Sequence, residues 1–71
     1  PDALESLEKQ YAKLRAEAPA SDRSPEIFLL AGLNDMGLSE RIKAELERID
    51  QAYPNDAMVK ALIKAYAPVV K

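Results

Sequence analysis

The side chains of this chain that could take part in chemistry are carboxylates, lysines, serines and tyrosines, because the sequence contains no histidine and no cysteine. Their absence removes the commonest general base, the commonest metal ligand and every thiolate nucleophile. Neighbouring carboxylates such as Glu5 and Glu8, or Glu45 and Asp50, lie on expected surface faces and lack the spacing of metal ligands. No serine stands in a Gly-x-Ser-x-Gly turn, and two glycines form no phosphate-binding loop. The sequence therefore predicts a protein that is not an enzyme and that holds no metal or cofactor.

Binding is the chemistry that remains, and two polar pairs are candidates for it. Lys60 and Lys64 stand four residues apart and form, with Lys71, the one local excess of positive charge. These lysines would bind an acidic segment of a partner. Alternatively, they form a solvent-exposed face, with positive charges that are favourable near the C-terminus of a helix. Asn34 and Asp35 end an otherwise apolar segment. They would hydrogen-bond a peptide backbone, or simply terminate a helix.

Apolar candidates for partner binding lie near the C-terminus. The helix expected at about 56–67 has a wide apolar surface and is followed by Val69 and Val70. This is more apolar surface than a core of 71 residues needs, and exposed apolar patches mark partner sites or self-association. Tyr66 would anchor a partner or pack at the rim of the core.

Apolar residues recur at helical spacing along the whole chain and predict four helices, at about 2–18, 25–36, 39–53 and 56–67. The segment Ser24 to Met36 organises the rest, because it is apolar on nearly every side and should lie among the other helices. Ser24 is expected to cap it, and Gly37 to close it in a left-handed conformation. Ser39 and Asp56 are the expected caps of the next two helices.

These elements predict an all-α fold, a small four-helix domain of antiparallel helical hairpins with the Ser24–Met36 helix at its centre. Residues 1–71 form a single domain. Since the chain begins at Pro1 rather than at methionine, we expect it to be a piece of a longer protein. Without a membrane-length apolar run or a signal pattern, and with a net charge of −2, it is expected to be soluble, a cytoplasmic location being favoured.

Several short motifs are similar to the tetratricopeptide repeat family. They are Pro25-Glu26-Ile27, Leu30-Ala31, Met36-Gly37 and Tyr53-Pro54-Asn55-Asp56, the last leading into Val59, Leu62 and Ile63. The resemblance covers roughly Ser24 to Tyr66. The helix at 2–18 would then correspond to the second helix of a preceding helix pair. That family is built of antiparallel helix pairs that mostly bind peptides or partner proteins on a concave face. The resemblance therefore implies a protein or peptide partner.

A competing motif is Gly37-Leu38-Ser39 followed by the helix at 39–53, which resembles the turn of helix-turn-helix DNA binders. In that helix acidic residues outnumber basic ones by one, and Glu40, Glu45 and Glu47 would repel phosphates. The expected function is thus a protein–protein interaction or adaptor module that binds a partner or itself. A DNA-binding domain that uses helix 39–53, and a structural, oligomerising or engineered helical scaffold, are the alternatives. A nucleic acid or a membrane is not an expected partner.

Overall fold

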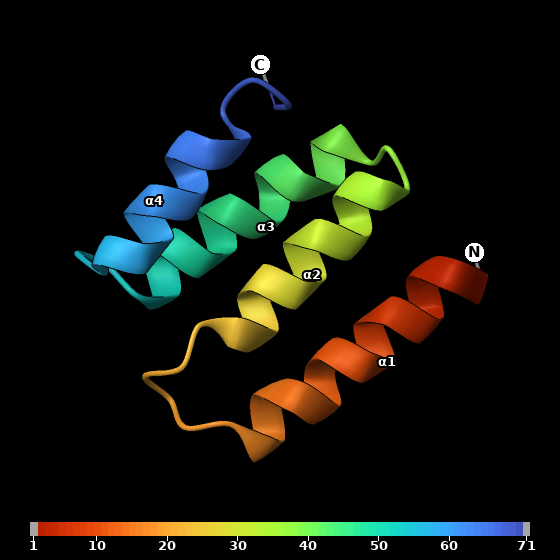
Figure 1. The fold of residues 1–71 in the computed structure, drawn as a ribbon, viewed down its shortest axis with the longest axis horizontal. Coiled ribbons are helices and arrows are strands. Elements are labelled where there is room, and N and C mark those ends of the chain that lie inside the picture. The colour runs from red at the N-terminus through yellow and green to blue at the C-terminus, as the bar shows by residue number, and fades with distance from the viewer. Residues whose placement is uncertain (1, 71) are drawn as a thin grey trace.

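The structure is a computed structural model that describes residues 2–70, and in this part of the chain four helices follow one another with short connections (Figure 1). The helices are α1 (Asp2–Glu17), α2 (Ser24–Asp35), α3 (Ser39–Ala52) and α4 (Ala57–Tyr66). Each helix packs against its neighbours in sequence, and the chain direction reverses at each connection. The predicted all-α fold of antiparallel hairpins is confirmed, and the predicted helix ends agree to within one residue.

The start of α2 differs from the prediction. Ser24 does not cap the helix, because it is already its first residue, and Arg23 in the capping position makes no side-chain cap. Instead, Asp22 accepts a hydrogen bond from the backbone nitrogen of Ser24 at 2.8 Å. This bond, with a second one from the Ser24 side chain, lowers the pKa of Asp22. Pro25 stands in the first turn of α2, where a residue without a backbone N–H costs no hydrogen bond.

The other helix ends follow ordinary turn chemistry. Gly37 closes α2 with a φ of +72°, as predicted. Ser39 was expected to cap α3, but it is the first helical residue, and Leu38 in the capping position has no side-chain acceptor. The predicted cap of α4 is confirmed, since Asp56 accepts a hydrogen bond from the Val59 backbone nitrogen at 3.0 Å.

The helices form an open array two layers thick. Arg41 and Arg48 of α3 reach Glu8 and Tyr11 of α1, so α1 and α3 adjoin in one layer. The thickness between Cα atoms is 15 Å, against 33 Å and 32 Å in the other two directions. Two layers of helices about 10 Å apart account for that thickness. In the described residues α1 and α4 lie at opposite edges without extensive packing, so the array does not close into a bundle.

The core lies along the line where α2 and α3 meet their neighbours. It consists of nine buried apolar residues: Leu7, Leu29, Leu30, Leu33, Ile42, Leu46, Ile49, Val59 and Leu62. Leu7 packs directly against the backbone of Gly32. A Cβ at this position would lie 2.5 Å from a Leu7 methyl carbon, so a larger residue would not fit without a shift. The expectation that α2 is buried on every side is wrong. Ile27 is 40% exposed and Ala31 is also exposed, because an open array covers α2 only on the sides of α1 and α3.

Replacing the turn glycine tests the closure of α2. Gly37→Ala should lower the free energy of unfolding by about 1 kcal/mol, because a Cβ disfavours the left-handed conformation. Nothing lies within 4 Å of the position of that Cβ, so the backbone alone causes the loss. Urea denaturation followed by circular dichroism measures it. Gly37→Asn is the control and should lose less, since asparagine tolerates this conformation; equal losses would contradict the explanation.

The lowered pKa of Asp22 makes its contribution to stability depend on pH. The folded state favours the ionised carboxylate, so the contribution is present above the ordinary aspartate pKa of about 3.9. It is lost as the pH falls through the lower, folded value. Asp22→Ala should therefore be less stable than the parent chain at pH 7, and the difference should shrink below about pH 4. Thermal unfolding at a series of pH values measures this, and a difference that is constant with pH would contradict it.

Candidate functional site

A buried carboxylate joins α1 to α2. Glu26 is fully buried, and it accepts hydrogen bonds from the Arg15 guanidinium at 2.7 and 2.9 Å and from the Tyr11 hydroxyl at 3.0 Å. Arg15 also donates to the carbonyls of Pro19 and Asp22, which fixes the connection between the two helices. The hydrogen bond to Glu26 raises the pKa of Arg15. We call Tyr11, Arg15, Arg23 and Glu26 the Glu26 cluster.

Arg23 extends this cluster to the second hairpin. Its guanidinium lies 3.6 Å from Glu26 and 3.7 Å from Asp56, within the range of ion pairs but too long for hydrogen bonds. It also stacks on Tyr53, 3.5 Å from the centre of the ring. Because Asp56 caps α4, Arg23 holds the starts of α2 and α4 at the same end of the molecule.

Tyr11 connects the cluster to α3. Its hydroxyl accepts a hydrogen bond from Arg48 at 3.0 Å, and the Arg48 guanidinium lies 5.6 Å from the centre of the ring. Burial raises the pKa of Tyr11, although the bond from Arg48 opposes the rise. The charges of the cluster balance one another, although Arg23 Nε and Nη1 are buried without a hydrogen-bond partner. The cluster therefore positions the helices and offers no open reaction centre.

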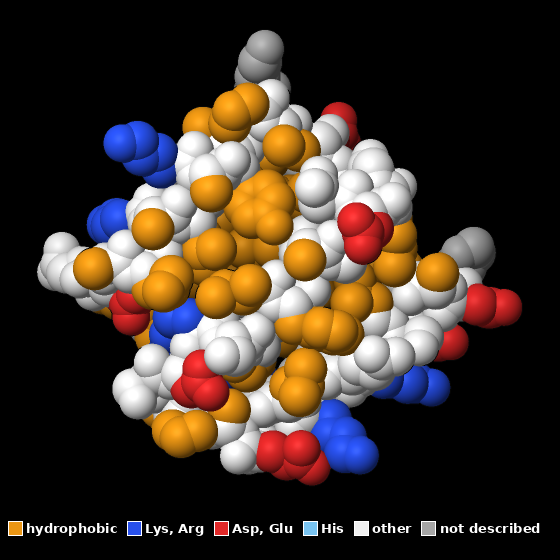
Figure 2. All heavy atoms as spheres, viewed as in Figure 1, with side chains coloured by type: hydrophobic (Ala, Val, Ile, Leu, Met, Phe, Trp, Pro, Cys, Tyr) orange, Lys and Arg blue, Asp and Glu red, His pale blue; other side chains and the backbone are white. Residues whose placement is uncertain are grey.

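A broad apolar surface lies over α2 and α4. Ile27, Phe28 and Ala31 of α2 are exposed or half-buried, as are Met58, Ala61 and Ala65 of α4. Within each set the spacing of three and four residues puts the side chains on one side of the helix, and we call the two sets together the apolar face. Ile27 and Met58 are 40% and 47% exposed. Figure 2 shows hydrophobic side chains gathered over α2, α4 and the space between them, with most charged side chains toward the outline. Such a concentration on one side of a small domain is typical of a binding surface.

The layer of α1 and α3 differs from this face because its charged side chains pair with each other. Arg41 binds Glu8, and Arg48 binds Glu45 at 2.7 Å. These pairs are largely exposed and stabilise the fold only slightly. Their exposed charged groups do, however, keep the outer surface of α1 and α3 in contact with water.

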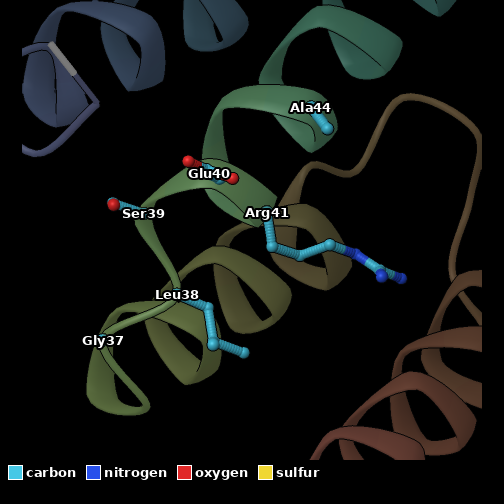
Figure 3. Close-up of a pocket in the computed structure, with 6 residues that line it drawn as sticks. All are labelled: Gly37, Leu38, Ser39, Glu40, Arg41 and Ala44. Atoms are coloured by element: carbon cyan, nitrogen blue, oxygen red, sulfur yellow. The ribbon is translucent and has the colours of Figure 1, made fainter.

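The turn between α2 and α3 carries a shallow open depression, shown in Figure 3. It is lined by Gly37, Leu38, Ser39, Glu40, Arg41 and Ala44. The Arg41 side chain points away from Glu40 and Ser39, toward α1. In residues 2–70 no group of acidic side chains is arranged to hold a metal ion. The depression therefore brings together no catalytic constellation.

The structure spreads the candidate residues named from the sequence over several places. Asn34 and Asp35 are exposed at the end of α2. On α4, Lys64 is exposed, and Lys60 forms an ion pair with Asp50 at 2.9 Å, so a carboxylate of α3 already balances it. Lys71 lies outside the described residues.

The three C-terminal apolar candidates are not equally exposed. Tyr66 and Val70 are half-buried against the core, while Val69 is 38% exposed. Val70 also borders a small apolar hollow of about 160 Å³ between α3 and α4.

Sequence reasoning predicted the wide apolar surface of the helix at about 56–67, but it missed the α2 part of the apolar face and the Glu26 cluster. Ile27 was expected to lie among the other helices, and no buried partners were expected for Glu26. One signal was present: Tyr11 and Arg15 are one helical turn apart, so they lie on the same face of α1 as its apolar residues. A tyrosine and an arginine so placed require a buried acceptor.

Comparison with protein-family models, curated proteins and solved structures finds no match to this chain. Among residues 2–70 no helix has the length and apolar character needed to cross a membrane. Function must therefore be argued from the site itself.

Removing the buried carboxylate tests the role of the Glu26 cluster. Glu26→Ala leaves Arg15 without its carboxylate partner and leaves Arg23 with Asp56 alone, so it should lower the free energy of unfolding by roughly 3–5 kcal/mol. Urea denaturation measures the loss. Glu8→Ala, which breaks the exposed pair with Arg41, is the matched control and should lose less than about 1 kcal/mol. Comparable losses in the two variants would contradict a structural role for the cluster.

Proposed function

We propose that this chain is a non-enzymatic protein–protein interaction module that buries its apolar face against another polypeptide. The observation that carries the proposal is that Ile27 of α2 and Met58 of α4 are exposed, on the two helices over which hydrophobic side chains gather in Figure 2. Burying such side chains is favourable by about 25 cal/mol per Å² of apolar surface. The Glu26 cluster supports the face, because Arg23 connects the start of α2 to the start of α4.

The charge distribution favours a protein over DNA as the partner. Glu40 and Glu47 are exposed on α3, the helix that a helix-turn-helix reading would place in the major groove. Arg41 and Arg48 are engaged with Glu8, Glu45 and Tyr11, so they are not free to neutralise phosphates.

The open arrangement of antiparallel hairpins also supports a tetratricopeptide-like mode of binding. In such an arrangement the helices of one layer present a continuous surface to a partner. Here α2 and α4 are the helices that carry apolar side chains to that surface. A purely structural scaffold is less favoured, because its outer positions would more often be polar.

Peptide selection tests the proposal. Helical peptides selected from a displayed library should bind the chain, with dissociation constants measured by fluorescence anisotropy. Met58→Lys should raise those constants at least about tenfold, since a charge would replace a central apolar contact. Ala44→Lys is the control, because Ala44 is exposed on α3 in the other layer, and it should change little. Binders that are insensitive to Met58→Lys, or the absence of binders to a monomeric chain, would contradict the proposal.

A further inference from the structure

We infer that the occupant of the apolar face is a second copy of this chain, related by a two-fold axis that runs parallel to the helices between α2 and α4. This inference rests on the proposed interaction role and names the partner. It follows from the direction of the helices, from two unpaired charges and from the size of the side of the molecule that carries the face.

The direction of the helices makes the face self-complementary. Arg23 holds the starts of α2 and α4 at the same end, so the two helices run parallel (Figure 1). A rotation about the proposed axis lays α2 of one copy over α4 of the other without reversing either. Ile27 near the start of α2 then meets Met58 near the start of the second copy's α4, and the contact occurs twice.

The same rotation brings opposite charges together at the far ends of these helices. Asp35 is exposed at the end of α2 and Lys64 near the end of α4, and in residues 2–70 neither takes part in an ion pair. Along a helix, Asp35 lies about 12 Å beyond Ile27, and Lys64 about 9 Å beyond Met58. A lysine side chain spans the difference, so Asp35 of each copy reaches Lys64 of the other. Charge pairs of this kind fix the register of an interface.

The side of the molecule that carries the apolar face is wide enough for a stable dimer. The whole array measures 33 Å by 32 Å between Cα atoms, so one side of it offers at most roughly 1,000 Å². Specific interfaces bury about 800 Å² per partner. Small domains with a limited core often gain stability by oligomerisation. A second copy would cover α2 and α4 on the side that the open array leaves exposed.

Sedimentation equilibrium at near-physiological salt tests the inference. The chain of 7.8 kDa should sediment with twice that mass at micromolar concentration. Met58→Lys should give a monomer with unchanged helical circular dichroism, while Ala44→Lys should remain a dimer. Asp35→Lys or Lys64→Asp alone should raise the dissociation constant of the dimer roughly tenfold. Either change places like charges opposite each other at positions 35 and 64, and the two-fold axis repeats this contact. The double variant Asp35→Lys/Lys64→Asp should restore it, and a carbodiimide should cross-link Asp35 to Lys64 between copies of the parent chain.

A monomer at all concentrations, a dimer that persists in Met58→Lys, or a double variant as weak as the single ones would overturn the inference. The peptide selection separates this failure from that of the proposed function. If the chain is monomeric but binds peptides in a Met58-dependent way, the two-fold dimer is wrong and the interaction role stands. If it is monomeric and binds no peptide, both are wrong.

Discussion

The buried carboxylate of Glu26 is the interaction on which the arrangement of the helices depends. A carboxylate removed from water is tolerated only if its lone pairs are satisfied and its charge is balanced. Here Tyr11 and Arg15 come from α1, and Arg23 carries the connection on to Tyr53 and Asp56. Apolar packing alone would allow the hairpins to slide or rotate, whereas this set of directional contacts specifies one arrangement. The geometry of the apolar face therefore follows from a polar feature that lies beneath the surface.

Much of the fold could be predicted from the sequence because local rules decide it. Spacings of three and four residues located all four helices, and Gly37 and Asp56 marked ends whose chemistry is local. Ser24 and Ser39 were misplaced by one residue, because serine suits both the capping position and the first turn of a helix. The short connections were enough to predict antiparallel neighbours.

The candidate site could not be predicted to the same extent, because it depends on whether the array closes. A closed bundle with the same helices would bury Ile27 and Met58, and the sequence pattern fits either arrangement. Lys60 illustrates the second difficulty, since its partner Asp50 lies on another helix and is not its neighbour in sequence. Which charges remain free for a partner is a property of the tertiary structure.

The packing of each helix only against its neighbours in sequence also bears on how the chain folds. Contacts between segments close in sequence require little loop-closure entropy, and helical domains of this kind fold within microseconds to milliseconds. Such an array also opens from its edges. Because α4 packs extensively against α3 only, amide protons of α4 should exchange with solvent sooner than those of α2. The terminal helix that carries Met58 is then the part of the molecule best able to adjust when a surface is placed against it.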